Sequence, residues 1–206
     1  MTAQGERGKG GELLALLPGS RPMELARHLA VFCRAAKLIR EARPAVKPVL
    51  AVTAGAPREE ISRRAREAAG FEIPVLAGRT REVLAAADLA IVVSGTATLE
   101  AALLGCPMIV CYRTGWVNYL LGRLLVTIPC IALANIVAGR PVVPELWQGE
   151  VNPGQIADSA LALLEDVDAR KRISQALLGL REKLGPRQSS RRAAEAVAGA
   201  LAKARA

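Results

Sequence analysis

Aromatic residues, histidine and cysteine are scarce in this sequence, and each scarcity argues against a class of function. Phe, Trp and Tyr make up 3% of the 206 residues, so few rings are present to stack on nucleobases. No known DNA- or RNA-binding module is recognisable, and we expect no nucleic-acid partner. The four cysteines and one histidine lack the spacing of a zinc site or a disulfide framework. This predicts a cytoplasmic, reducing location and no bound metal.

The sequence also lacks long apolar runs. Its most apolar stretch, 124–138, is too short to cross a bilayer and contains Thr127, Pro129 and Asn135. Residues 1–11 are polar and glycine-rich, without the apolar core of a signal peptide, and are predicted to be a disordered leader. The Gly-Lys-Gly-Gly run at 8–11 precedes a predicted strand, whereas a phosphate-binding loop follows one.

Basic residues outnumber acidic ones, 28 to 19, which gives a net charge of +9. Most of them alternate with Asp and Glu on predicted helix surfaces, where solvation explains them. The remaining excess attracts polyanions over a long range. With nucleic acid set aside, an anionic membrane surface or a phosphorylated substrate is the expected partner.

Apolar residues make up 51% of the chain and occur as short strands that alternate with amphipathic helices. Strands are predicted at 13–17, 49–52, 73–76, 89–93 and 108–112, and helices at 22–40, 58–69, 81–87 and 97–104. This order predicts an α/β fold over 12–150, a Rossmann-like parallel sheet with helices on both faces. A helix at 116–126 and a further strand at 128–133 are also expected.

From residue 151 onward the pattern is helical only. Asn152 and Pro153 form a helix start, a second helix is expected at 168–184, and Ser189 or Ser190 begins a third. Residues 151–206 are therefore predicted to form a helical carboxy-terminal tail, which either packs on the domain or is exchanged with a partner. The Asp166–Asp168 segment resembles a metal-binding Asp-x-Asp, but its place between two helices favours helix capping.

Two predicted strand-to-helix turns carry small and polar residues. In 94–100, Ser94, Gly95 and Thr96 precede a helix, and Glu100 lies one turn inside it. Unpaired amides at such a helix start suit phosphate, and the carboxylate suits a sugar diol. A simpler interpretation is that Glu100 is an acid favoured near a helix N-terminus.

The turn at 17–21 has the same architecture. Gly19 permits close backbone approach, Ser20 can cap the helix or hold a phosphate oxygen, and Arg21 can pair with phosphate through two N–H groups. Arg21 can instead pair only with Glu24. Two such turns at one edge of a parallel sheet favour an anionic ligand there. His28, on the helix that follows, is expected to have a packing or surface role.

These motifs carry a family resemblance. Residues 16–21, 94–100, 107–112 and 144–148 stand in the order found in lipid-A-disaccharide synthases, and Gly185-Pro186 also fits. The resemblance covers about residues 12–200. It implies the second, donor-binding domain of a GT-B glycosyltransferase, which moves diacylglucosamine from UDP to a lipid monosaccharide phosphate and forms a β-1,6 disaccharide. The UDP-sugar is a substrate, and neither a metal nor another cofactor is implied.

The resemblance also implies roles for particular residues. The diphosphate would lie at Gly19, Ser20 and Arg21, with Ser94, Gly95 and Thr96 as a second phosphate-side turn. Glu100 would hold the ribose hydroxyls, and Asn135 and Gln148 would lie near the donor. The family has proline where this chain has Ala134, which bears on the loop geometry around Asn135.

The amino-terminal half of a GT-B enzyme, with its acceptor site and catalytic base, has no counterpart in this sequence, so no catalytic residue is assigned. The chain is then either a donor-binding half that needs an amino-terminal partner, or a non-catalytic nucleotide-sugar-binding module. A donor domain of another UDP-sugar transferase or an epimerase is a third alternative. The resemblance also implies peripheral association with the inner face of the cytoplasmic membrane and a homodimer. The helix predicted at 116–126 is the candidate membrane patch, and burial in a core or dimer contact is its alternative.

Overall fold

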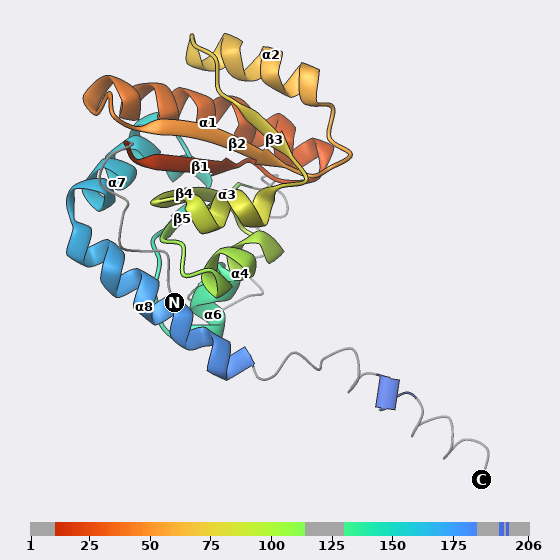
Figure 1. Cartoon of the computed structure of the whole chain (residues 1–206), viewed down its shortest axis with the longest axis vertical. Coiled ribbons are helices and arrows are strands. Elements are labelled where there is room, and N and C mark those ends of the chain that lie inside the picture. Colours follow the sequence, from red (N-terminus) through yellow and green to blue (C-terminus); the bar gives the residue numbers. More distant parts are fainter. Residues whose placement is uncertain (1–10, 114–129, 185–193, 196, 198–206) are drawn as a thin grey trace.

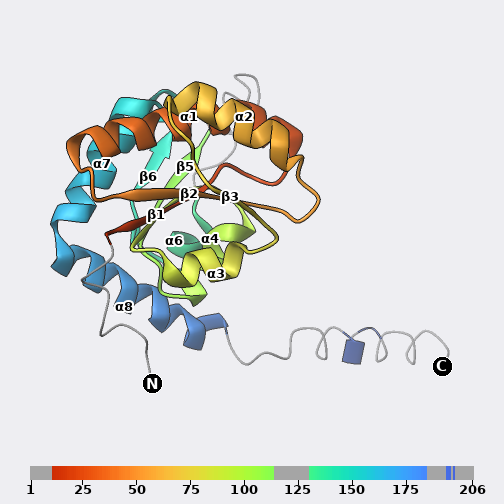
Figure 2. The same cartoon turned by 45° about the horizontal axis from the view of Figure 1, so that its top comes forward.

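The computed structural model describes residues 11–113, 130–184, 194, 195 and 197. Within them, six strands form one parallel sheet in the order β3-β2-β1-β4-β5-β6 (Figures 1 and 2). The strands are β1 (Leu13–Leu17), β2 (Lys47–Val52), β3 (Val75–Ala77), β4 (Leu89–Val93), β5 (Met108–Tyr112) and β6 (Glu145–Trp147). The helices are α1 (Pro22–Ala42), α2 (Arg58–Ala69), α3 (Thr80–Ala86), α4 (Thr96–Leu103), α6 (Leu133–Ala138), α7 (Pro153–Glu165) and α8 (Val167–Leu184), with a 3-10 turn at Gln148–Glu150.

The predicted α/β fold is confirmed. The central strands are continuous apolar runs because both faces of the sheet are covered, and all five residues of β4 are buried. Helices α1, α2 and α7 pack on one face and α3, α4, α6 and α8 on the other, as Figure 2 shows. Each face has its own core of Leu, Ile, Val and Ala, with Phe32 of α1 fully buried in the first.

The strand order creates a switch point between β1 and β4. The chain runs outward from β1 through β2 to β3, then returns to place β4 on the other side of β1. Leu17 lies beside Val92, so both strands end at the same level. The two helices that follow depart to opposite faces, which opens a crevice where such sheets bind ligands.

The strand expected at 128–133 is wrong in its described part. Residues 130–132 are not in a strand, and Leu133 begins helix α6. The edge of β5 is taken instead by β6, which pairs in parallel with Val110 through Tyr112. The Glu145 carboxylate of β6 accepts hydrogen bonds from the amides of Ile131 and Ala132, at 2.8 and 2.9 Å, which removes these donors from any sheet ladder.

Helices α7 and α8 pack on the domain. The Asn152 side chain caps α7 by accepting from the amide of Gln155 at 3.0 Å, and α7 lies along α1. Asp166 accepts from the amide of Ala169 at 2.7 Å, so its capping role is confirmed, and α8 then crosses α4 and α6. Among the described residues, no helix combines the length and apolarity needed to cross a membrane. Residues 1–10 of the leader predicted at 1–11, the helix at 116–126 and the helix start at Ser189 or Ser190 lie outside the described residues.

Candidate functional site

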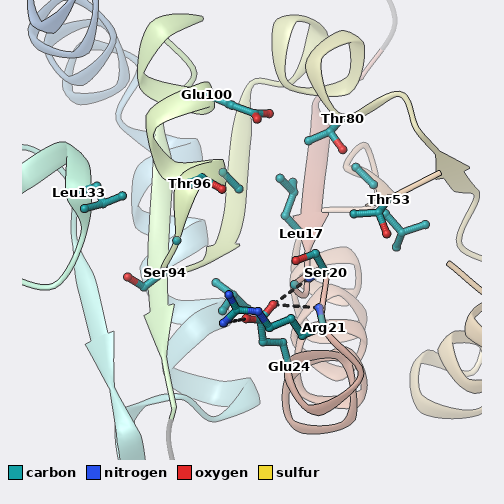
Figure 3. Close-up of a pocket in the computed structure, with 16 residues that line it drawn as sticks. Leu17, Ser20, Arg21, Glu24, Thr53, Thr80, Ser94, Thr96, Glu100 and Leu133 are labelled. Carbon is teal, nitrogen blue, oxygen red and sulfur yellow. Dashed lines mark hydrogen bonds and ion pairs between the residues drawn. The ribbon is translucent and has the colours of Figure 1, made fainter. Parts of the chain in front are cut away.

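A cavity of about 500 Å³ lies at the switch point, at the carboxyl edge of the sheet (Figure 3). Both predicted turns line it. Gly19, Ser20 and Arg21 lie on one side, and Ser94, Gly95, Thr96 and Glu100 lie on the other. The lining continues past the end of β1 to Thr53, which follows β2, and Thr80, which begins α3. Seven of the nine residues that the sequence put forward as a site therefore share one hollow.

The first turn is held together by a glutamate. Glu24, in the first turn of α1, accepts from the amides of Ser20 and Arg21 through Oε2, at 2.8 and 3.2 Å. Its Oε1 lies 3.7 Å from a guanidinium nitrogen of Arg21, whose side chain is 83% exposed. The Arg21–Glu24 pair that the sequence allowed is therefore present. A helix cap by Ser20 is not, because Arg21 occupies the N-cap position and makes no side-chain cap bond.

Gly19 is required by this geometry. Its φ of +110° lies in a region that side-chain-bearing residues rarely adopt. A Cβ at this position would lie 2.4 Å from Cβ of Glu24 and 2.6 Å from its Oε2. The glycine is thus the residue that allows the glutamate to fold back over the turn.

The second turn is neutral and is tied to the neighbouring segment. The Ser94 hydroxyl donates to the carbonyl of Ile131 at 3.1 Å, and the Thr98 hydroxyl donates to the carbonyl of Gly95 at 2.7 Å. Gly95 is the N-cap of α4, and a Cβ on it would meet no atom within 4 Å. The turn therefore presents an unobstructed backbone and the start of a helix to the cavity.

Glu100 stands across the cavity from the Arg21–Glu24 pair, on the same side as Thr80 (Figure 3). It is exposed, and within the described part of the chain its carboxylate has no hydrogen-bond or ion-pair partner. The charged lining is thus one arginine and two glutamates. A free carboxylate at the wall of a cavity is available to hydrogen-bond donors such as hydroxyl groups.

Asn135 lies apart from this cavity and is used within the protein. Its amide nitrogen donates to the carbonyl of Val143 at 2.9 Å and to Glu145 at 2.8 Å. Its oxygen accepts from the amides of Val142 and Val143, at 2.7 and 2.9 Å. The buried side chain thus fastens α6 to the segment before β6. It also lines a separate hollow of about 410 Å³ with Cys130 and Trp147. Its role near a donor stays a prediction.

Gln148 follows β6 and is not among the residues that line the switch-point cavity. Its φ of +46° is the single positive value among the described non-glycine residues. Left-handed backbone at a residue other than Gly, Asn or Asp costs free energy and concentrates at functional positions. Its part in donor binding also stays a prediction.

Sequence reasoning missed two residues that shape the region. Glu24 was expected only as a partner for the Arg21 side chain, although its position three residues after the N-cap is the spacing of a capping box. Glu145 ties α6 to the sheet, and no local pattern announces this because its partners Ile131, Ala132 and Asn135 stand 10 to 14 residues earlier.

His28 has the packing role that was expected. It is 1% exposed, its Nδ1 lies 2.8 Å from the carbonyl of Glu24, and its ring lies against Phe32. Burial, with a smaller effect of Arg113, lowers the pKa of His28, and Nε2 has no partner among the described residues. Burial likewise raises the pKa of Cys33 and Cys111 to about 12. The described residues contain no group of three or more side chains that could hold a metal.

Solved structures share this fold. The complex of Staphylococcus aureus MnaA with UDP matches 93% of the chain with a TM-score of 0.63 at 12% identity, and the match covers 47% of that protein. The spinosyn rhamnosyltransferase SpnG bound to thymidine diphosphate matches 84% with a TM-score of 0.54 at 20% identity, and covers 41% of that protein. The fold is therefore that of one half of a GT-B glycosyltransferase or a related epimerase.

Sequence comparison gives the family. A family model described as lipid-A-disaccharide synthetase matches residues 8–200. The lipid-A-disaccharide synthase of Syntrophus aciditrophicus is 44% identical over 88% of this chain, and that of Myxococcus xanthus is 40% identical over 92%. The chain spans about half the length of these relatives, 47% and 49%. It belongs to the lipid-A-disaccharide synthase family, as a glycosyltransferase domain of that family.

Proposed function

We propose that the chain is the donor-binding half of a lipid-A-disaccharide synthase and holds UDP-diacylglucosamine in the switch-point cavity. One observation carries the proposal: the turns after β1 and β4, together with Glu100, line the same hollow of about 500 Å³. The family membership supplies the substrate class, and the fold supplies the usual ligand position of an open parallel sheet.

The chemistry of the lining suggests how the donor lies. The diphosphate would meet Arg21 and the backbone of Gly19 and Ser20 on one side, and the 94–96 turn at the start of α4 on the other. Glu100 would accept hydrogen bonds from the two ribose hydroxyls. The uracil ring of UDP would then extend toward Thr53 and Thr80, beyond the ends of β2 and β3. Neither a metal nor another cofactor is needed for this arrangement.

The transfer step needs groups from elsewhere. The attacking acceptor hydroxyl must lose a proton, and a base within hydrogen-bond reach assists this loss. The carboxylates that line the cavity are Glu24, beside the turn proposed for the diphosphate, and Glu100, which the ribose would occupy. We therefore propose that an amino-terminal half supplies the base and the lipid acceptor site. The joined enzyme would work on lipid substrates at the inner face of the cytoplasmic membrane, as a peripheral protein and a homodimer.

Calorimetry with UDP on the chain tests the donor site. Glu100→Ala removes hydrogen bonds to a charged acceptor and is expected to weaken UDP binding by about 10- to 100-fold. Arg21→Ala is expected to weaken it by about tenfold. Glu182→Ala on α8 and Arg58→Ala on α2 change the same charges at exposed positions outside the cavity and should leave the affinity unchanged. Unchanged affinity in both cavity variants would exclude the assigned site.

A disaccharide-forming assay tests the enzymatic half of the proposal. The chain is expected to turn over the donor only when the amino-terminal half of a relative is supplied. UDP binding without product under that condition would favour the non-catalytic nucleotide-sugar-binding module.

A further inference from the structure

Two consecutive backbone N–H groups of the first turn point at one carboxylate oxygen. Oε2 of Glu24 accepts from Ser20 at 2.8 Å and from Arg21 at 3.2 Å, as the dashed lines of Figure 3 show. Successive amides that converge on one anion form a nest, the arrangement by which protein backbone binds phosphate. In this structure the nest is filled by a side chain of the same protein.

The turn is shaped for an anion, and Glu24 fits the space. The empty side of Gly19 faces the carboxylate, since a Cβ on Gly19 would lie 2.6 Å from Oε2. A phosphate oxygen in the nest would need the same space and the same two donors. Glu24 and a phosphate therefore exclude each other at this position.

The charges that line the cavity also make Glu24 a competitor of an anionic ligand. The lining carries Arg21, Glu24 and Glu100, a net charge of −1. Arg21, the cation of the set, is already paired with Glu24 at 3.7 Å. A diphosphate that approaches this wall thus meets a carboxylate that holds both the amides and the arginine it would use.

The Glu24 side chain can rotate out of the turn without disturbing the core. Its side chain is 28% exposed and that of Arg21 is 83% exposed, so neither is fixed in the core. The structure contrasts here with Asn135, whose amide is buried and bound on both sides to protein groups. Rotation of Glu24 out of the turn would release two N–H donors and the guanidinium together.

We propose that Glu24 is a built-in stand-in for the donor's phosphate, which occupies the Ser20–Arg21 nest until the diphosphate displaces it. The proposal rests on the proposed function for the identity of the donor. It makes Glu24 a positioning residue for Arg21 and gives the site a preference for ligands whose phosphates can displace a carboxylate. A nucleoside without phosphates gains nothing from the exchange.

Substitution of Glu24 separates competition from a merely structural role. Glu24→Gln keeps an oxygen that can accept from the turn but removes the charge, and Glu24→Ala empties the nest. Both variants are expected to bind UDP more tightly, the glutamine variant by about tenfold, or about 1.4 kcal/mol. Uridine affinity should stay unchanged in both. Glu41→Gln, at the far end of α1, is the control for loss of one negative charge on the same helix.

Calorimetry with UDP, uridine and inorganic pyrophosphate, together with thermal unfolding of each variant, gives the decision. Tighter UDP or pyrophosphate binding with unchanged uridine binding would support displacement. A role in shaping the turn alone predicts the reverse, weaker binding of UDP and pyrophosphate in the alanine variant. The proposal is overturned if neither folded variant binds UDP or pyrophosphate more tightly than the unsubstituted chain. Tighter pyrophosphate binding with no UDP binding by any form would reject the UDP site and retain the displaceable glutamate.

Discussion

The two edges of the parallel sheet carry hollows of comparable size, but their charged side chains are used differently. The carboxyl-edge cavity has about 500 Å³, and a hollow of about 670 Å³ lies at the amino edge, between the start of β1 and α8. At the amino edge Glu12 accepts from Arg43 at 2.5 and 3.0 Å and lies 3.6 Å from Arg170. Asp88 accepts from the amide of Leu13 at 2.8 Å. The charges there hold the protein together.

At the carboxyl edge the charged groups face the hollow. Glu100 has no partner in the described part of the chain, and Glu24 and Arg21 hold each other at the cavity wall. The charged groups around the larger hollow thus have more of their hydrogen bonds and ion pairs made within the protein. What identifies a ligand site is the presence of groups with unused or exchangeable hydrogen bonds, and the volume of the hollow is secondary.

The largest expected effect is at the amino edge. Glu12→Ala leaves Arg43 and Arg170 side by side without their carboxylate, at positions where Glu12 and Arg170 are largely buried. We expect a loss of about 3 kcal/mol in the free energy of unfolding, measured by urea denaturation. UDP affinity should not change.

Glu41→Ala is the matched control for Glu12→Ala. Glu41 forms an exposed pair with Lys37 at 3.9 Å, and its loss is expected to cost less than about 0.5 kcal/mol. Equal losses in the two variants would mean that the amino-edge network is no more than another surface ion pair.

At the carboxyl edge, Gly19→Ala is expected to act mainly on binding. The new methyl group would occupy the space that Glu24 and a phosphate oxygen share, and UDP affinity should fall by more than about tenfold. The positive φ should cost about 1 to 2 kcal/mol of stability. Gly70→Ala carries the same kind of backbone strain, with φ +79° and no atom within 4 Å of the new Cβ. If it weakens UDP binding as much, the effect of Gly19→Ala is not local.

Sequence patterns predicted the layers of the fold because each element satisfies a local rule. Strands β1, β4 and β5 are unbroken apolar runs, and helix α2 ends at Gly70, which adopts the left-handed conformation at the helix end. Strand β6 was not predicted because it has three residues, all of them half-buried, which carry no periodic signal. The false strand at 128–133 failed because Glu145, distant in sequence, takes the backbone donors of Ile131 and Ala132.

For the site, the sequence predicted the residue types and the positions of the turns. It did not predict which partners the side chains bind. The glycine and hydroxyl residues after β1 and β4 do line one cavity, since both strands end at the same level. The four hydrogen bonds of Asn135 depend on partners seven to ten residues away in sequence, so a motif cannot reveal them. The binding roles themselves depend on a ligand, and they stay predictions.

A smaller effect, on the pH dependence of the free energy of unfolding, is expected from His28 on α1. Burial lowers the pKa of His28 from 6.5, so below about pH 6.5 the unfolded chain binds a proton that the native chain refuses. Stability is then fully present above pH 6.5 and falls as the pH drops below it. Urea denaturation of the unsubstituted chain and of His28→Leu at both pH values measures the difference. Parallel pH profiles of the two proteins would contradict this, because they would mean that the pKa of His28 is the same in the folded and unfolded chains.

The smallest effect concerns the contact between α8 and the helix that carries Glu100. The guanidinium of Arg181 donates to the carbonyl of Leu103 at the end of α4, through Nε at 2.8 Å, and Lys183 donates to the carbonyl of Ala138 at the end of α6 at 2.9 Å. Cations at helix C-termini stabilise by fractions of a kcal/mol, and both side chains are exposed.

Arg181→Ala should therefore cost about 0.5 kcal/mol in urea denaturation and leave UDP affinity unchanged. Lys171→Ala is the control, since Lys171 lies on α8 and, among the described residues, pairs with Asp168 at 3.4 Å and with no group of α4. A fall in UDP affinity for Arg181→Ala alone would show that α8 positions α4 and its glutamate, and would make the carboxyl-edge site depend on the carboxy-terminal helices.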